Sequence, residues 1–176
     1  SQKGALSFDI NSGSLLQSNV AVKNNVLSMN GTAPINENQG YAVVPEFLLE
    51  KARGTRFSTL MKIKNTDGTI TSTDKAVGLK NATEAVIYVS IATSFNGFDK
   101  NPATQGLNDK KIASENLNKA FAKSFDKLKS SHIADYQKFY NRVTLELGKT
   151  SAPDLATDER LLRYSDGKED KNLEIL

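Results

Sequence analysis

Residues 85–93 read AVIYVSIAT, a stretch in which two kinds of side chain alternate. Ile87, Val89 and Ile91 form one wholly aliphatic row, whereas the row between them is mixed and partly apolar. Successive side chains of a β-strand point to opposite faces, and β-branched and aromatic residues favour strands. The stretch therefore predicts a strand with two largely apolar faces, which places it in the centre of a β-sheet.

Short segments of similar composition precede this strand. They are rich in β-branched and aromatic residues and are separated by Asn and Gly, a pattern typical of antiparallel sheets. We expect strands at 6–10, 14–17, 19–22, 26–29, 41–44, 57–64, 69–72, 76–79 and 85–92. Turns are expected at 11–13, 24–25, 30–31 and 67–68. Many short strands at this spacing predict a mainly β fold, an antiparallel β-sandwich over residues 1–106.

The Asp67-Gly68 pair is the clearest turn signal. Both residue types can take positive φ, as a type I′ turn requires, and the pair joins the segments MKIKN and TITST. We therefore expect these two segments to pair closely as a hairpin.

From Lys111 the period of the apolar residues lengthens, which indicates helix. One side of that helix carries Leu117, Phe121, Phe125, Leu128, His132, Tyr136, Phe139 and Val143. Asn108 or Asp109 can cap its start, and Ser130-Ser131 can break the run and begin a second helix. One kinked helix and two consecutive helices both fit this pattern.

Two shorter signals follow the helical region. The segment VTLELG at 143–148 alternates like a strand that returns to the edge of the sandwich. Thr157 then offers a hydroxyl group to cap a further helix that begins with TDERLL.

Composition excludes several classes of protein. A chain of 176 residues with 38% hydrophobic content can form one domain with a core and an appended linker. It has no apolar run near the roughly 20 residues that cross a bilayer, and its start lacks the order of a secretory signal. The absence of cysteine excludes disulfides and Cys-ligated zinc, and the single histidine, His132, excludes a His-rich metal site. The net charge of +3 comes from scattered lysines, so nucleic-acid binding is not expected.

The candidate binding residues lie in the segment NGFDKNP, just after the strand at 85–93. Asp99 is the acidic residue best placed in a loop, and the rings of Phe95 and Phe98 could line a sugar. A lone aspartate beside Asn and Gly is more often a turn former, however, so a structural role is favoured over catalysis. We take Phe95, Asn96, Phe98 and Asp99 as a candidate sugar or interdomain contact, with no catalytic residue, cofactor or metal site expected.

The other polar candidates also favour structural roles. A histidine on an apolar helix face, such as His132, is more often a packing residue than a catalyst. The acidic clusters Asp158-Glu159 and Glu169-Asp170 are expected to cap and solubilise helix starts.

Three blocks of sequence carry a resemblance to a known family: TSFNGFDKNPATQG at 93–106, SSHIADYQKFYNRVTLELG at 130–148 and TDERLLRYSDGKEDKNLEIL at 157–176. In this order they resemble the region where the N-terminal β-sandwich of family-95 glycoside hydrolases, the α-L-fucosidases and their relatives, passes into the catalytic helical barrel. The resemblance implies a partial supersandwich-like domain at 1–106. It further implies a linker helix or helix pair with a returning strand at 107–148, and the start of the catalytic region at 149–176.

The resemblance also implies a function. The parent enzyme would be an inverting exo-α-L-fucosidase, or α-L-galactosidase, that needs no metal or other cofactor and draws its catalytic groups from an (α/α)6 barrel. The present chain would support and position that barrel and would not hydrolyse glycans alone. A carbohydrate-binding module with its own sugar site is the alternative, and a stand-alone adhesion or oligomerisation domain is disfavoured because TDERLL resembles the beginning of a domain.

The surroundings of the chain follow from the same resemblance. Its partners would be its own barrel and, through the parent enzyme, a glycan. Because the family's sandwich is larger, its first strands are expected to lie outside this sequence, and the open sheet edges could support a homodimer. A periplasmic or secreted location in a bacterium is expected.

Overall fold

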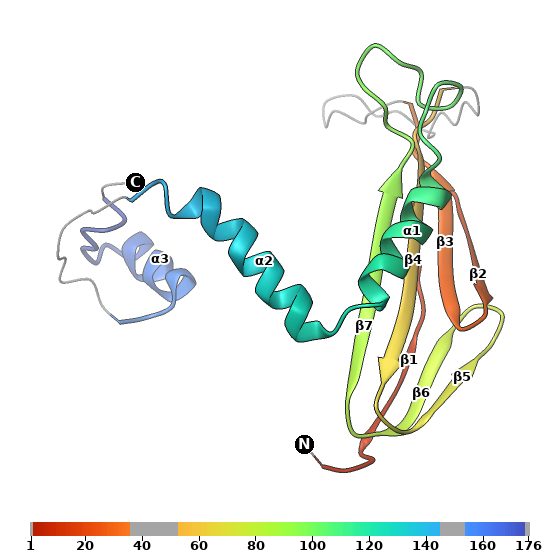
Figure 1. The fold of residues 1–176 in the computed structure, drawn as a ribbon. Helices are drawn as coiled ribbons and strands as arrows, with labels where there is room; N and C mark the ends of the chain where they lie inside the picture. Colours follow the sequence, from red (N-terminus) through yellow and green to blue (C-terminus); the bar gives the residue numbers. More distant parts are fainter. Residues whose placement is uncertain (1, 36–52, 145–153, 175–176) are drawn as a thin grey trace. The chain divides into compact units, whose positions relative to one another are not determined.

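The computed structural model describes residues 2–35, 53–144 and 154–174. The chain divides into two compact units, Ser1–Lys129 and Ser130–Leu176, which are described separately below. The described residues form seven strands and three helices, and all seven strands belong to the first unit (Figure 1).

The strands form two antiparallel sheets. In chain order they are β1 (Leu6–Ile10), β2 (Ser18–Lys23), β3 (Val26–Thr32), β4 (Arg56–Asn65), β5 (Thr69–Ser72), β6 (Val77–Ala82) and β7 (Ala85–Thr93). One sheet has the order β1-β6-β5 and the other the order β2-β3-β4-β7. The predicted antiparallel sandwich is therefore confirmed. Residues 14–17 form no strand, and the predicted strand 41–44 lies outside the described residues.

The core lies between the two sheets. Leu27 and Ile63 from one sheet pack with Val77, Leu79 and Ala82 from the other, and all five are buried. These residues come from apolar positions of the strands, which the alternation of side chains directs toward the opposite sheet. The buried cluster fixes which face of each sheet points inward.

The hairpin predicted at Asp67-Gly68 is wrong. The segment before it belongs to β4, which pairs with β3 and β7, whereas the segment after it is β5, which pairs with β6. Of the two residues only Gly68 takes positive φ, at 79°. Asp67 instead accepts hydrogen bonds from the backbone N and the Oγ1 of Thr83, both at 2.6 Å. The turn therefore carries the chain from one sheet to the other.

The asparagine turns have mixed outcomes. Asn24 and Asn25 have φ values of 53° and 58° and join β2 to β3, as predicted. The turn predicted at Asn30-Gly31 is wrong, because both residues lie in β3. A Cβ atom on Gly31 would collide with the ring of Phe57, so this glycine allows a close approach of neighbouring groups.

The helices are α1 (Asp109–Phe121), α2 (Phe125–Tyr140) and α3 (Thr157–Ser165). The side chain of Asn108 caps α1 by accepting a hydrogen bond from the Lys111 N at 3.0 Å, as predicted. Thr157 does not cap α3, because the N-cap residue is Ala156. Among the described residues, no helix has the length and apolar content to cross a membrane.

The helical region contains two consecutive helices, which was one of the two predicted arrangements. The break lies at residues 122–124, where Ser124 Oγ accepts a hydrogen bond from the Lys127 N at 3.2 Å. The predicted break at Ser130-Ser131 is wrong, because these residues lie inside α2. Most of the predicted returning strand, residues 145–148, lies outside the described part of the chain.

The prediction that the strand at 85–93 is central is also wrong. Among the described residues, β7 is the last strand of its sheet and pairs with β4 alone (Figure 1). Its mixed row, including Tyr88 and Ser90, is buried on the face that α1 covers, whereas its aliphatic row is exposed. Ala113 and Leu117 are the buried apolar residues of α1. The less apolar face of β7 is therefore the one that α1 covers. The alternation of side chains within the strand could not predict this, because it carries no information about α1.

Candidate functional site

The segment that connects β7 to α1, residues 94–108, carries the candidate residues and is closed at its base by Ser94. The Ser94 N donates a hydrogen bond to the Arg56 carbonyl, and its Oγ accepts one from the Arg56 N, both at 2.9 Å. Its carbonyl accepts a third from the Leu107 N at 3.0 Å. Ser94 is fully buried, so one residue joins both ends of the loop to β4.

A second set of polar contacts fixes the loop to the start of α1. Arg56 donates through Nη1 to the Ala103 carbonyl at 2.7 Å and through Nε to Asp109 Oδ1 at 3.4 Å. Asp109 is buried, and its Oδ2 accepts a hydrogen bond from Ser58 Oγ at 2.6 Å. A carboxylate in the first turn of a helix also interacts favourably with the helix dipole. The loop is thus held on β4 by charge-assisted hydrogen bonds, of which the one between Ser58 and Asp109 is buried and those of Arg56 are partly buried.

Gly106 allows the two arms of the loop to approach each other. A Cβ atom at this position would collide with the carbonyl oxygens of Pro102 and Ser94, which are backbone atoms and cannot rotate away. Only glycine therefore fits here without moving the backbone.

The structure brings the four candidate residues together on this loop, but in different roles. The rings of Phe95 and Phe98 meet edge to face, with centroids 5.5 Å apart. Phe95 is half exposed and Phe98 fully exposed. Asn96 supports the loop itself, because its Nδ2 donates to the Gln105 carbonyl at 2.9 Å. Asp99 is exposed beside the aromatic pair.

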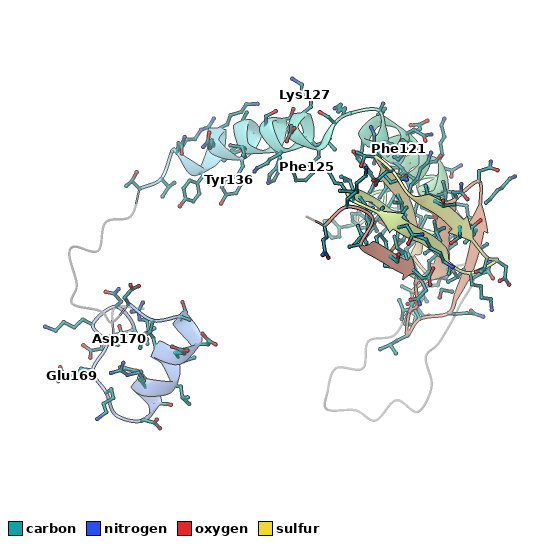
Figure 2. All side chains as sticks on the ribbon, turned by 90° about the horizontal axis from the view of Figure 1, so that it is seen from below. Phe121, Phe125, Lys127, Tyr136, Glu169 and Asp170 are labelled. Carbon is teal, nitrogen blue, oxygen red and sulfur yellow. The ribbon has the colours of Figure 1, made fainter. Side chains whose placement is uncertain are left out.

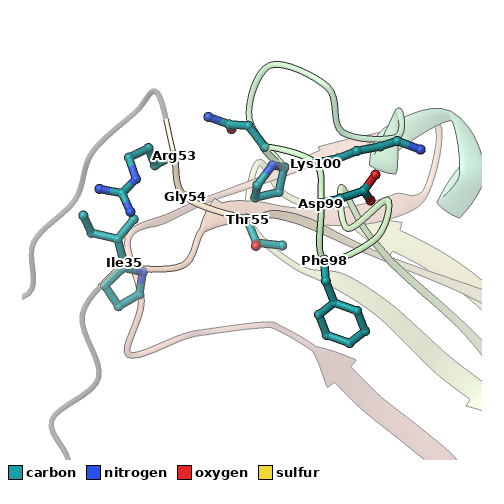
Figure 3. Close-up of a pocket in the computed structure, with 10 residues that line it drawn as sticks. Ile35, Arg53, Gly54, Thr55, Phe98, Asp99 and Lys100 are labelled. Atoms are coloured by element: carbon teal, nitrogen blue, oxygen red, sulfur yellow. The ribbon is translucent and has the colours of Figure 1, made fainter.

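An open groove of about 450 Å³ lies next to these residues. Its lining comprises Pro34, Ile35, Arg53, Gly54, Thr55, Phe98, Asp99, Lys100, Asn101 and Pro102. Figure 3 shows Arg53 and Ile35 on one side and the segment with Asp99 and Lys100 on the other. This combination of cations, a carboxylate and an aromatic ring can hold a polar ligand.

The described residues of the groove do not supply the groups for glycoside hydrolysis. That reaction uses two carboxyl groups on either side of the scissile bond, and Asp99 is the single carboxylate among the described lining residues. The described part of the chain also holds no group of three or more His, Asp or Glu residues that could bind a metal ion. The geometry of the described groove therefore favours binding over catalysis.

The helical candidates lie apart from this groove. His132 is exposed on α2, so the packing role predicted for it is not seen among the described residues. Its ring centroid lies 6.3 Å from that of Tyr136. Asp158 and Glu159 lie in the first turn of α3, where their charge favours the helix start, but the predicted capping is wrong, because the N-cap residue is Ala156 and no side chain caps this helix.

An ion pair in the second unit was missed from the sequence. Arg160 donates through Nε and Nη2 to the two carboxylate oxygens of Asp170, at 2.8 and 2.7 Å. These hydrogen bonds hold the pKa of the nearly buried Asp170 at about 2, against an ordinary value of 3.8. The sequence pattern instead grouped Asp170 with Glu169, which is exposed, and predicted that both residues act at a helix start. Gly167, which takes a φ of 81° just after α3, was the signal of a chain reversal that could bring the pair together.

The helix α2, which contains the boundary between the two units, presents an apolar face that is exposed among the described residues. Its exposed large apolar side chains include Ile133, Tyr136, Phe139 and Tyr140, and none of its residues is buried. Figure 2 shows Lys127 on one side of the helix and Phe125 and Tyr136 on the other. Tyr136 and Tyr140 stack with centroids 5.3 Å apart. The predicted amphipathic pattern is present without a described partner.

Comparison with known proteins identifies the family. Residues 1–97 match the family described as "Glycosyl hydrolase family 65, N-terminal domain". The chain belongs to this family. Residues 124–176 match the family described as "Glycosyl hydrolase family 95 catalytic domain".

One relative adds to this assignment. The chain is 23% identical over 190 residues to "Alpha-L-fucosidase 2" of Arabidopsis thaliana. The match covers 100% of this chain and 22% of the relative, so the chain spans about a fifth of that protein's length. An N-terminal-domain match followed by a family-95 catalytic-domain match confirms the resemblance drawn from the three sequence blocks.

Proposed function

We propose that this chain is a non-catalytic N-terminal part of an inverting exo-α-L-fucosidase, or α-L-galactosidase, and that it supports and positions the catalytic domain. The observation that carries the proposal is the order of the two family matches, together with the relative's name, "Alpha-L-fucosidase 2". A bacterial enzyme that acts on glycans in the periplasm or outside the cell remains part of the proposal, although the relative is a plant protein.

The structure supports a scaffolding role in two ways. The loop at 94–108 is held on β4 through Ser94 and Asp109, so it offers a fixed surface. The exposed apolar face of α2 falls inside the segment that matches the catalytic-domain family. An exposed apolar surface of this kind is typical of an interaction site. We assign the remainder of the catalytic barrel of the full-length protein as its partner.

Sugar binding by the sandwich is the second candidate function. Phe98 is fully exposed at the rim of a groove that also contains the Asp99 carboxylate. An aromatic ring beside a hydrogen-bonding group is a common way to hold the apolar face and the hydroxyl groups of a sugar.

Two measurements separate these functions. Incubation of the purified chain with a chromogenic α-L-fucoside should release no product, because the described groove has one carboxylate. Turnover by the pure chain would overturn the scaffold proposal. Titration with L-fucose and fucosylated oligosaccharides, followed by amide chemical shifts, then tests binding.

The titration has a matched control. Saturable shifts at Phe95–Asp99 that disappear in Phe98→Ala but persist in Phe125→Ala, an exposed phenylalanine of α2, would establish the sugar site. An absence of shifts with any sugar would leave the scaffold as the function of the domain.

A further inference from the structure

Phe121, the last residue of α1, is held between two side chains of the sheet. Its ring meets the ring of Tyr88 edge to face, with centroids 5.3 Å apart, and Lys62 Nζ lies 4.1 Å from its centroid. Lys62 and Tyr88 are directly paired residues of β4 and β7, so their side chains point to the same face of the sheet. Figure 2 shows Phe121 beside the sheet. The register of the two strands therefore sets the place of this ring.

The same face of the sheet also binds carbonyl groups at the end of α1. Lys64 Nζ donates a hydrogen bond to the Phe121 carbonyl at 3.4 Å, and the hydroxyl group of the buried Tyr88 donates one to the Lys123 carbonyl at 3.1 Å. The last carbonyl groups of a helix have no partner within it and form the negative end of its dipole. A lysine and a hydroxyl group from the sheet are therefore suitable partners for them.

The break between α1 and α2 is short, because it consists of residues 122–124. On one side of it, the Lys123 N donates to the Ala120 carbonyl at 2.9 Å and so continues the last turn of α1. On the other side, the Ser124 hydroxyl group accepts the hydrogen bond that caps the start of α2. The Lys123 carbonyl lies between these two turns. The Tyr88 hydroxyl group thus binds the backbone at the point where one helix gives way to the next.

This point adjoins the start of the catalytic-domain match. The N-terminal-domain match ends at residue 97, and the catalytic-domain match begins at residue 124, directly after Lys123. All of the contacts described above lie within the first unit. Each residue with free backbone dihedrals adds conformations that must be lost when a segment takes one place. Contacts that fix the break therefore reduce the entropy cost of placing the segment that follows.

We propose that Lys62, Lys64, Tyr88 and Phe121, which we name the Phe121 cluster, position the start of the catalytic-domain segment on the sandwich. The Tyr88 hydroxyl group is the positioning group, because it acts on the backbone of Lys123 and not on a substrate. The effect on turnover rests on the proposed function. The ordering of the break does not, since it depends only on the contacts within the first unit.

Tyr88→Phe tests the ordering in this chain, because it removes the hydroxyl group and keeps the buried ring. A neutral hydrogen bond contributes about 0.5–1.5 kcal/mol, so amide hydrogen exchange at residues 122–128 should become about threefold faster or more. Amides of β4 that pair with β3 should keep their rates. Tyr164→Phe removes an exposed tyrosine hydroxyl group on α3 and should leave residues 122–128 unchanged.

Lys64→Met gives a second variant that leaves the buried ring contacts in place. It removes the donor to the Phe121 carbonyl and keeps most of the apolar stem, so exchange at residues 122–128 should again become faster. Lys110→Met makes the same chemical change at an exposed lysine in the first turn of α1 and should leave these rates unchanged.

The full-length protein tests the effect on turnover. Tyr88→Phe should lower kcat for a chromogenic α-L-fucoside about twofold or more and leave KM unchanged. The reason is that a less ordered break leaves fewer molecules in the active arrangement but does not alter the contacts with the sugar. Lys110→Met should leave both constants unchanged.

The outcomes are distinct. Unchanged exchange at residues 122–128 in Tyr88→Phe would overturn the proposal. Equal acceleration at these residues and throughout β4 would assign Tyr88 a general role in stability and would also overturn it. Faster exchange with an unchanged kcat in an active full-length enzyme would overturn the positioning role. A full-length protein without fucosidase turnover would instead overturn the proposed function, and the exchange rates would still decide whether the Phe121 cluster orders the break.

Discussion

Ser58 Oγ donates a hydrogen bond to Asp109 Oδ2 at 2.6 Å and so joins the start of β4 to the first residue of α1, 51 positions later in the sequence. Both residues are buried. Because Arg56 approaches the other oxygen of the same carboxylate, the start of the helix has one fixed place on the sheet. The candidate loop, residues 94–108, ends at this helix start, so these two contacts help to fix its position on β4.

Removal of this carboxylate should destabilise the sandwich. Asp109→Ala removes the charged acceptor of the buried Ser58 hydroxyl, which keeps Asn30 Oδ1 as a neutral acceptor, and it removes the acceptor of Arg56 Nε. Hydrogen bonds to charged groups contribute about 1.5–3 kcal/mol. We expect urea denaturation to show a free energy of unfolding lower by about 2 kcal/mol. Glu115→Ala, which removes an exposed partner of Lys111, should change it by less than about 0.5 kcal/mol. An equal loss of unfolding free energy in both variants would mean that the buried Ser58–Asp109 contact adds no stability beyond that of an exposed ion pair.

Truncation of a core side chain should lower the stability of the sandwich more than the loss of Asp109 does. Leu79→Ala opens a cavity between the sheets at a fully buried position, and such changes usually cost about 2–5 kcal/mol. Leu15→Ala makes the same chemical change at a fully exposed leucine and should be nearly silent. Thermal denaturation followed by circular dichroism compares the two. A similar midpoint temperature of unfolding for both variants would contradict the assignment of Leu79 to the core.

The loop should not tolerate a side chain at Gly106. Gly106→Ala would force the Pro102 and Ser94 carbonyls apart, so we expect amide shifts throughout residues 94–108 and a lower stability. Gly13→Ala provides the control, because a Cβ atom there meets no other atom within 4 Å. Shifts confined to the immediate neighbours of Gly106 would show that the loop adjusts without strain.

The pair Arg160–Asp170 should make the second unit sensitive to acid. The hydrogen bonds from Arg160 lower the folded-state pKa of Asp170 from 3.8 to about 2. A carboxyl group with a lowered pKa stabilises the folded state above its unfolded pKa. That contribution should therefore be complete above about pH 5 and fall progressively as the pH drops toward about 2.

The carboxyl carbon shift of Asp170 measures this directly by NMR. Its titration midpoint should lie near 2 in the natural chain and move toward 3.8 in Arg160→Ala. Arg160→Lys keeps the charge but loses the bidentate geometry, so its midpoint should lie between the two. An unchanged midpoint in Arg160→Ala would assign the shift to the backbone donors at Asn172 and Leu173 instead.

Local sequence signals predicted most of the secondary structure. Strands β1 and β5 were predicted with their observed bounds, and the Asn108 cap and the Asn24-Asn25 turn follow from side-chain chemistry within a few residues. Such signals depend on the segment itself, so no knowledge of the remainder of the fold was needed.

The errors share a physical cause, which is contact between distant segments. Asp67-Gly68 has the residues of a hairpin, but its neighbours pair with strands in different sheets. The exposed row of β7 has the composition of a buried strand, and its burial depends on what lies beside it. The Arg160–Asp170 pair likewise forms only after α3 ends and the chain reverses at Gly167.

The sequence could predict which loop carries the candidate site, but not the contacts that its residues make. The sequence indicated that Phe95, Asn96, Phe98 and Asp99 share a loop, and they do. It could not indicate that Asn96 is used within that loop, or that Arg53 and Thr55, from about 40 positions earlier, line the adjoining groove. These partners come from the sheet pairing rather than from the local pattern.

The pairing of β1 with β6 has a consequence for the order of folding. Leu6 lies opposite Ala82, so this ladder closes a long stretch of chain, whereas β2 and β3 are joined by a tight turn. Closing a long loop has a larger entropic cost than closing a hairpin, and non-local pairing slows folding. During synthesis, β1 must therefore leave the ribosome and wait for β6 before its backbone groups find their partners. We expect this first strand to be the last to acquire protection from hydrogen exchange.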